Sequence, residues 1–313
     1  MKNLFHLVLA LALIWSVMVS VGPAEEVPAA DEWLARPVDD RTFQTYLDFF
    51  AYDRRVPFDL RILDVAEQEG IRKEHLSFES TPGVRVFAQL YRPVVLVSPK
   101  GPAVILLHGG VATGKDSKAI EMLAVLQARA GWKVLAIDMQ YFGERSTDLL
   151  KTYTGQEKHE RLYNRPGTYL GWVTQTVKDV SRSFDFLVEQ RNVDPKRIAL
   201  MGFSRGAQVG AIAGGAERRL AAVVLLHGGH FDALECGHLP AACPANYIGR
   251  ISPRPLLMIN GNHDTDYLKD TSVLPLFRLA NPPKLILWRD TRHGVLTEED
   301  RSAMLHWLKE NLK

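Results

Sequence analysis

Short runs of apolar residues alternate with helical patterns from residue 103 to the end of the chain, and few folds accommodate such an order. The run Ala103–Leu107 is apolar at every position, which is typical of a strand buried on both faces of a parallel sheet. Strands alternating with helices predict an α/β fold, in which helices flank a mainly parallel central sheet. The expected strands are 103–107, 133–137, 197–201, 222–226, 255–259 and 284–287, and the expected helices are 117–130, 174–190, one from Ser204, 267–279 and 298–312.

The region before this alternation has a different pattern. Thr81-Pro82-Gly83 predicts a turn, and Val84–Tyr91 alternates apolar and polar residues, so we expect a hairpin whose first strand begins near Leu76. Further upstream, apolar residues recur at helical spacing after Asp40, which is a candidate N-cap. The residues at this spacing are Phe43, Tyr46, Leu47 and Phe50, and a second helix is expected around Leu60, Ile62, Leu63 and Val65.

The first residues have the pattern of an export signal. Lys2 supplies a positive charge, Leu4–Val21 is almost wholly apolar, and Gly22 and Ala24 are small enough for the positions before a cleavage site. We expect cleavage after Ala24 and a secreted or periplasmic protein. The apolar run is also about long enough to span a bilayer, so an uncleaved membrane anchor is the alternative. The expected division is a signal peptide at 1–24, a mostly helical extension at 25–74 and an α/β domain at 75–313.

Charge and cysteine content narrow the classes of partner. The formal net charge is +2 and no basic run occurs, so binding to nucleic acid is not expected. The two cysteines, Cys236 and Cys243, follow the export signal, and in an oxidising compartment they predict one disulfide. Two cysteines alone do not make a metal site, and we expect neither a metal nor a cofactor.

The most informative motif is Gly202-Phe203-Ser204-Arg205-Gly206, which lies between an expected strand and an expected helix. This context is the one that a nucleophile elbow requires, because the serine must project from a sharp strand-to-helix turn. Small residues two positions before and after the serine permit that turn. Ser204 is therefore the expected nucleophile, and a glycine-tightened turn without catalysis is the alternative.

A serine hydroxyl needs a base, and the base needs an acid that orients it. In this architecture the chain order is serine, acid, histidine. His293 follows the last expected strand and is the expected base. Asp264 follows the strand at 255–259 and is the expected acid, with Asp266 as its main competitor unless that residue caps the next helix.

The remaining site residues are expected on loops at the carboxyl ends of the strands. A tetrahedral oxyanion needs preorganised donors, and we expect the backbone N–H groups of Arg205 and Gly110, with His108 ordering the Gly110 loop. The Arg205 side chain either holds a substrate carboxylate or pairs with a nearby acid. The connections 141–170 and 227–252 are the expected substrate walls, and the expected pocket residues are Tyr141, His227 and His230.

Together these residues resemble the α/β-hydrolase superfamily, and most closely its dienelactone hydrolase and prolyl oligopeptidase-like branch. The resemblance covers Leu76 to Leu312 and implies hydrolysis of an ester, thioester or amide through an acyl-enzyme, without a cofactor. It rests on the segments Leu107–Gly110, Asp138–Arg145, Val193–Ile198, Gly261–Asp264 and His293–Gly294.

Two departures from this branch shape the expected function. Dienelactone hydrolases proper have a cysteine nucleophile at the position that resembles Ser204. The serine here argues against dienelactone as the substrate. Too few residues precede the sheet for the propeller of the oligopeptidases. We therefore expect a carboxylic-ester hydrolase acting on a small-molecule ester, with an exported peptidase or amidase and a non-catalytic binding protein as the alternatives.

Overall fold

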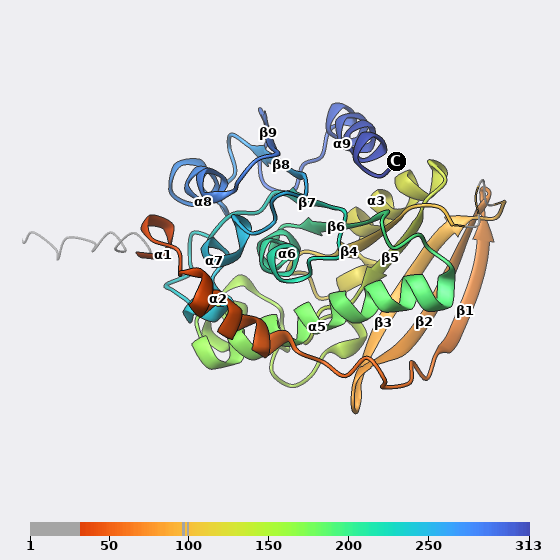
Figure 1. The fold of residues 1–313 in the computed structure, drawn as a ribbon. Helices are drawn as coiled ribbons and strands as arrows, with labels where there is room; N and C mark the ends of the chain where they lie inside the picture. The colour runs from red at the N-terminus through yellow and green to blue at the C-terminus, as the bar shows by residue number, and fades with distance from the viewer. Residues whose placement is uncertain (1–31, 96–97, 99) are drawn as a thin grey trace, which may run out of the picture.

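The computed structural model describes residues 32–95, 98 and 100–313. Its centre is one nine-stranded sheet, in the order β1-β2-β3-β5-β4-β6-β7-β8-β9 (Figure 1). The strands β1, β2, β3 and β5 pair antiparallel in that order, and all pairs from β5 to β9 are parallel. The strands are β1 Arg61–Gln68, β2 Ile71–Thr81, β3 Val84–Pro93, β4 Ala103–Leu107, β5 Lys133–Ile137, β6 Ile198–Phe203, β7 Ala222–Leu226, β8 Leu256–Gly261 and β9 Lys284–Arg289.

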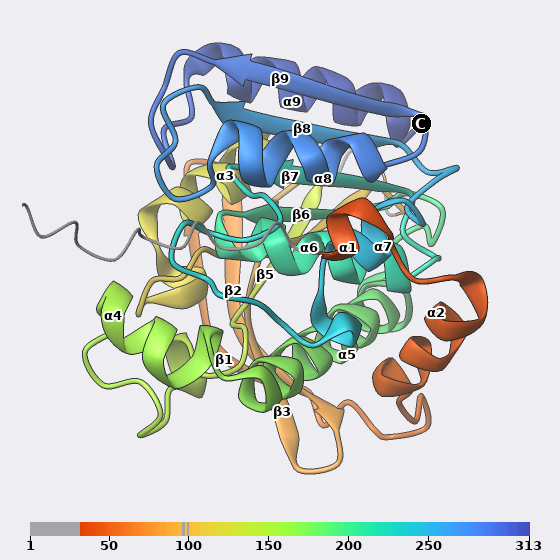
Figure 2. The same cartoon turned by 90° about the vertical axis from the view of Figure 1, so that its left-hand side faces the viewer.

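Helices cover both faces of the sheet. α3 and α9 lie on one face, and α5, α6, α7 and α8 lie on the other (Figures 1 and 2). The α-helices are α1 Glu32–Ala35, α2 Asp40–Leu47, α3 Lys118–Arg129, α4 Gly155–Lys158, α5 Pro166–Arg191, α6 Arg205–Ala216, α7 Ala245–Ile248, α8 Leu274–Leu279 and α9 Glu298–Asn311. Short 3-10 helices are η1 Asp48–Phe50, η2 Gly114–Asp116, η3 Gly143–Arg145 and η5 Pro240–Ala242, and π-helical turns are η4 His159–Tyr163 and η6 Lys269–Val273.

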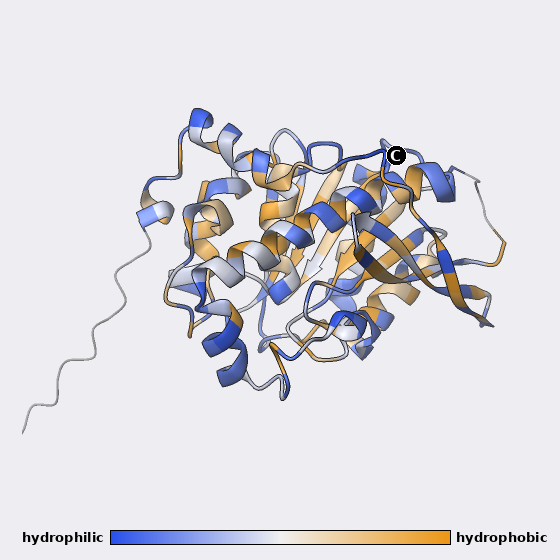
Figure 3. Cartoon of the chain, turned by 90° about the horizontal axis from the view of Figure 1, so that it is seen from below, coloured by the Kyte–Doolittle hydropathy of each residue, from blue (hydrophilic) through white to orange (hydrophobic). Residues whose placement is uncertain are grey.

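The core is divided by the sheet because successive side chains of a strand point to opposite faces. Within β4, Ile105 and Leu107 pack in the cluster beneath α5, whereas Val104 and Leu106 pack against α3 and α9. All five residues of β4 are buried. Hydrophobic colour is accordingly concentrated on the central strands and on the helix faces turned toward them (Figure 3). The predicted fold class, a mainly parallel sheet flanked by helices, is confirmed.

The predicted second helix in the N-terminal extension is wrong. Residues around Ile62 and Val65 belong to β1, which pairs antiparallel with β2, so the sheet begins at Arg61 and not near Leu76. The β1–β2 turn has positive φ at Glu69 (49°) and Gly70 (75°), the combination that a tight type I′ hairpin turn requires. The apolar spacing that suggested a helix belongs to an exposed edge strand.

The first predicted helix forms as α2 and continues into η1. Its N-cap is Asp39 and not Asp40, because the Asp39 side chain accepts a hydrogen bond from the Thr42 N–H at 2.7 Å. The predicted signal peptide, 1–24, lies outside the described residues. Among the residues that are described, no helix has the length and apolarity to cross a bilayer.

Candidate active site

Ser204 occupies the turn between β6 and α6. Its backbone has φ 54° and ψ −118°, a conformation that costs a non-glycine residue free energy and persists only where the surroundings impose it. The Ser204 N–H donates to the Leu226 carbonyl of the neighbouring strand β7 at 2.8 Å. The strained turn projects the serine beyond the carboxyl end of the sheet, as the motif predicted.

The two glycines of the motif are required by close packing. A Cβ at Gly202 would lie 2.2 Å from the Gly206 carbonyl oxygen, and a Cβ at Gly206 would lie 2.5 Å from the His108 carbonyl oxygen. Both contacts are with backbone, which cannot move aside as a flexible side chain could. The loop after β4 therefore lies directly against the first turn of α6.

Three side chains from three strand ends form a continuous chain of hydrogen bonds. The Ser204 hydroxyl lies 2.8 Å from Nε2 of His293, which follows β9. The Nδ1 atom of His293 lies 2.8 Å from Oδ2 of Asp264, which follows β8. The Asp264 side chain is fully buried, whereas that of His293 is 20% exposed. This geometry requires the proton of a neutral His293 on Nδ1 and leaves Nε2 free to accept the proton of Ser204.

The surroundings of Asp264 keep it ionised. Its Oδ1 atom accepts hydrogen bonds from the N–H groups of Asp266 and Tyr267, both at 2.9 Å. Burial opposes ionisation, but the neighbouring imidazoles of His227 and His293 and the Tyr267 N–H hold the pKa of Asp264 well below its ordinary value. Asp264 thus presents a negative charge to His293 at neutral pH.

The competing acid occupies a different position. Asp266 is exposed, and its Oδ2 atom lies 3.6 Å from Nε2 of His293, the nitrogen that faces Ser204. It cannot orient the imidazole through Nδ1, because that nitrogen is bonded to Asp264. Asp266 does not cap the next helix either, since η6 begins at Lys269 after Leu268.

Gly110 and Arg205, whose N–H groups were the predicted oxyanion donors, lie next to each other. A Cβ at Gly110 would be 3.8 Å from Cβ of Arg205, and a Cβ at the preceding Gly109 would be 3.3 Å from Cβ of Ser204. His108 orders this loop: its Nδ1 donates to the Gly109 carbonyl at 2.6 Å, and its Nε2 accepts from the Met139 N–H at 3.0 Å. Burial lowers the pKa of His108, which keeps the ring neutral.

The Arg205 side chain pairs with acids, which decides between the two predicted roles. Its guanidinium forms ion pairs with Asp232 and Glu235, both from the connection after β7. It also lies over the ring of Tyr163, 3.7 Å from the ring centroid. Burial opposes ionisation of Glu235, but Arg205 and His238 hold the pKa of this carboxyl far below its ordinary value. The cation is therefore part of a buried network beneath the nucleophile.

Two residues near the nucleophile were missed by the sequence reasoning. Lys158, the last residue of α4, donates from Nζ to the Gly110 carbonyl at 2.6 Å. His159 donates from Nε2 to the Asp232 carboxylate at 2.9 Å and from Nδ1 to the Gly155 carbonyl at 2.7 Å. Burial alone would lower the pKa of His159, but these two acceptors raise it. Both residues stand in a connection without a readable motif, so only the fold brings them to the site.

The three predicted pocket residues lie in different surroundings. Tyr141 is half-buried, with φ 69°, and packs against the core beneath α5. His227 is fully buried behind the acid, with Nδ1 3.8 Å from Oδ2 of Asp264 and Nε2 donating to the Val295 carbonyl at 3.1 Å. His230 is also buried and stacks on Phe231. The two histidines therefore belong to the interior behind the site and do not line an open pocket.

The predicted disulfide is wrong, because Cys236 and Cys243 are not bonded to each other. Cys236 is exposed, and its N–H donates to Oδ1 of Asn164 at 3.2 Å. Cys243 is buried beyond η5, with Sγ 3.8 Å from Nε2 of His230. The intervening residues carry one thiol to the surface and the other into the core, and sequence proximity did not reveal this separation.

One group among the described residues has the makeup of a metal site, and it overlaps the hydrogen-bonded chain. His227, Asp264 and His293 each offer a ligand atom, and the three atoms lie within 4.8 Å of one another. A metal there would take a nitrogen of His293 and an oxygen of Asp264, two side chains that already bond to each other through Nδ1 and Oδ2. The group is better explained as the acid and base of the site with a histidine behind them.

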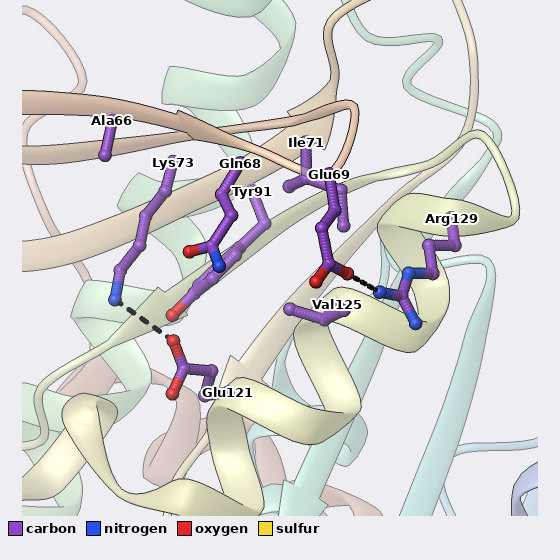
Figure 4. Close-up of a pocket in the computed structure, with 9 residues that line it drawn as sticks. All are labelled: Ala66, Gln68, Glu69, Ile71, Lys73, Tyr91, Glu121, Val125 and Arg129. Carbon is purple, nitrogen blue, oxygen red and sulfur yellow. Dashed lines mark hydrogen bonds and ion pairs between the residues drawn. The ribbon is translucent and has the colours of Figure 1, made fainter.

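A cavity of about 210 Å³ lies away from this site, between the β1–β3 strands and α3 (Figure 4). Lys73 and Glu121 form an ion pair at 3.5 Å across it. Every lining residue belongs to β1, β2, β3, the β1–β2 turn or α3. No carboxyl end of a parallel strand contributes to the lining, so this cavity is separate from Ser204.

Comparison with solved structures supports the fold at low sequence identity. Acetyl xylan esterase 1 from Thermoanaerobacterium sp. matches with a TM-score of 0.66 and 16% identity, covering 90% of this chain and 98% of that chain. An acetyl xylan esterase from Paenibacillus sp. R4 matches with a TM-score of 0.66 and 16% identity, covering 91% and 100%. A cold-adapted esterase from an Arctic intertidal metagenomic library matches with a TM-score of 0.62 and 17% identity, covering 84% of this chain and 100% of that chain.

Sequence comparison identifies the family. No curated protein matches the sequence closely enough to count as a relative. The model of the dienelactone hydrolase family matches residues 88–302, more than half of the chain. This match includes β4 to β9 together with Ser204, Asp264 and His293. The strained turn, the strand order and the match over these elements agree, and the chain belongs to the dienelactone hydrolase family.

Proposed function

We propose that this protein is a serine carboxylic-ester hydrolase that acts through an acyl-enzyme. The observation that carries the proposal is the hydrogen-bonded chain from Asp264 through His293 to Ser204. Its serine is held in a strained turn at the start of α6. A non-catalytic role would not require an ionised buried acid, a base and a partly exposed hydroxyl in this order.

The proposed reaction starts with attack of the Ser204 hydroxyl oxygen on the ester carbonyl carbon. Nε2 of His293 takes the hydroxyl proton, and Asp264 stabilises the imidazolium that forms. The N–H groups of Gly110 and Arg205 donate to the oxyanion of the tetrahedral intermediate. Collapse breaks the bond to the leaving oxygen, which receives the proton from Nε2. Water then repeats the sequence on the acyl-enzyme and releases the acid.

The proposed substrates are small to medium esters, with an acetyl ester on a carbohydrate as the leading class. Support comes from the names of structurally similar proteins, which include acetyl xylan esterases and a glucuronoyl esterase from Solibacter usitatus. We also propose that residues 1–24 act as a signal peptide, which would bring the enzyme to extracellular or periplasmic esters. The charge and length of that segment support export.

The function is tested by comparing an ester with its matched amide. We expect the purified protein to hydrolyse p-nitrophenyl acetate and to cleave p-nitroacetanilide far more slowly. Ser204→Ala should lower kcat for the ester by about 10³-fold or more, because the nucleophile is lost. Ser302→Ala, on the exposed side of α9, is the matched control and should retain the full rate.

Two results would contradict the proposal. One is an ester hydrolysis rate that Ser204→Ala leaves unchanged, which would place the chemistry elsewhere. The other is cleavage of the anilide at a rate equal to or above that of the ester, which would favour an amidase.

A further inference from the structure

Asp266 lies at the active site but has no role in the proposed chemistry so far. Its Oδ2 atom is 3.6 Å from Nε2 of His293, and its side chain is 58% exposed. In the described part of the chain, no residue other than His293 forms an ion pair or a side-chain hydrogen bond with this carboxylate. The carboxylate is therefore available to a molecule that enters from solvent.

Hydrogen bonds on both sides hold the backbone of Asp266. The Asp266 N–H donates to Oδ1 of Asp264 at 2.9 Å, and its carbonyl accepts from the Ala233 N–H at 2.8 Å. The first bond ties Asp266 to the acid of the site, and the second ties it to the connection after β7. Because the backbone is anchored, the carboxylate can move only by rotation of its own short side chain, which limits the entropy lost when it contacts a ligand.

The position of Asp266 relative to His293 indicates which part of the substrate Asp266 contacts. In the proposed reaction, Nε2 of His293 returns the serine proton to the leaving oxygen of the ester. The leaving oxygen must therefore come within hydrogen-bond distance of Nε2. A carboxylate oxygen 3.6 Å from the same nitrogen then borders the alcohol part of the ester and not its acyl part.

We propose that Asp266 selects the leaving group by accepting a hydrogen bond from a hydroxyl on the carbon next to the esterified one. The preferred substrates would then be esters of vicinal diols and larger polyols. This inference rests on the proposed function, because it assigns the leaving-group side from the role of His293. The neighbouring hydroxyl of a 1,2-diol is close enough to the ester oxygen to reach Oδ2 while Nε2 serves the leaving oxygen.

Charge favours a neutral hydroxyl over the other possible occupants. An anionic alcohol would be repelled by the Asp266 carboxylate, and the charge of the nearby Lys158 ammonium is already shared with Asp266 and Asp232. A cationic alcohol would lie beside the imidazolium that His293 becomes during the reaction, and like charges at that separation disfavour each other. A hydroxyl donates to the carboxylate without either penalty, and hydrogen bonds to a charged acceptor are stronger than neutral ones.

The test compares acetate esters that differ only beyond the leaving oxygen: 2-hydroxyethyl acetate, 2-methoxyethyl acetate and acetylcholine. We expect the wild type to prefer the hydroxyethyl ester over the methoxyethyl ester in kcat/KM by roughly three- to tenfold. This is the effect of one hydrogen bond to a charged acceptor, weakened because the carboxylate is exposed to solvent. Asp266→Ala should bring this ratio close to one. Asp266→Asn, which keeps an uncharged acceptor, should give an intermediate ratio.

Asp270→Ala is the matched control, since Asp270 is an exposed carboxylate of the following turn η6, and it should keep the wild-type ratio. The proposal is overturned if Asp266→Ala leaves the ratio unchanged while esters are still hydrolysed. It is also overturned if all three rates fall by one factor, which would mean that Asp266 acts through His293. A preference for acetylcholine that Asp266→Ala removes would show recognition of charge instead. If the wild type hydrolyses none of these esters, the proposed function fails together with this inference.

Discussion

At the residue scale, the site depends on contacts that tolerate little change. The turn that holds Ser204 at a φ of 54° needs glycine two residues to either side, because a Cβ at Gly202 would clash with the backbone of α6 and a Cβ at Gly206 would clash with the loop after β4. Asp264 is fixed with similar precision, since its Oδ1 atom accepts two backbone N–H groups. Only Oδ2 therefore remains to bond His293. Because the two oxygens have separate partners, the effect of replacing Asp264 by asparagine can be predicted.

We expect Asp264→Asn to lower kcat for an acetate ester by about 10³- to 10⁴-fold, as removal of the negative partner does in other serine triads. The two backbone N–H groups would retain the amide oxygen at the Oδ1 position, which turns the NH₂ group toward Nδ1 of His293. The histidine would then carry its proton on Nε2 and could not accept that of Ser204. Steady-state kinetics measure the effect, and Asp290→Asn, an exposed acid paired with His263, is the control. A loss below about tenfold would mean that Asp264 is not the acid.

The order of serine, acid and histidine, each after an expected strand, predicted all three hydrogen-bonded residues. The sequence alone does not separate Asp264 from Asp266, because two positions on one loop differ only in where their side chains point. The direction of the Asp264 side chain is set by hydrogen bonds from the N–H groups of Asp266 and Tyr267, and these groups reach the carboxylate only in the folded loop. Lys158 could not be predicted, since it stands in a connection without a recognisable motif and only the fold brings it to Gly110.

At the element scale, two long connections are held together beneath the nucleophile. Arg205, in the first turn of α6, pairs with Asp232 and Glu235 of one connection and lies over Tyr163 of the other. His159 of the second connection also binds Asp232. The network thus ties η4 and the segment after β7 to the helix that follows the nucleophile.

We expect Arg205→Met to lower the free energy of unfolding by about 3–5 kcal/mol, because it leaves buried carboxylates without their cation. Arg161→Met is the matched control: its guanidinium is half exposed and lies 3.8 Å from Glu157, so its loss should cost at most about 1 kcal/mol. Urea unfolding of both variants at neutral pH measures the difference. Equal small losses for the two arginines would show that the network does not stabilise the fold.

The elements themselves were predictable where burial was complete. β4, β5 and β7 have the predicted bounds because all their residues are buried and all but Lys133 are apolar. β1 was misread because all its residues are exposed. Its strand character comes from backbone pairing with β2, and pairing between strands leaves no trace in the apolar pattern of an exposed edge.

At the scale of the whole molecule, the strand order brings the site together. Ser204, Asp264 and His293 follow β6, β8 and β9, whose carboxyl ends lie along the same edge of the parallel part of the sheet. The antiparallel strands β1 to β3 extend the sheet at the other side, where the separate cavity lies. Residues up to 89 positions apart in the chain thereby form one hydrogen-bonded site.

The measurement that tests the catalytic assignment most directly is covalent labelling with a fluorophosphonate, which reacts with an activated serine whatever the natural substrate. Intact mass and peptide mapping would be read for the wild type, Ser204→Ala and His293→Ala. We expect one adduct on the wild type, located on Ser204, and no adduct on either variant. An unlabelled wild type beside a reactive control hydrolase, or an adduct that persists in Ser204→Ala, would contradict the assignment of Ser204 as a nucleophile activated by His293.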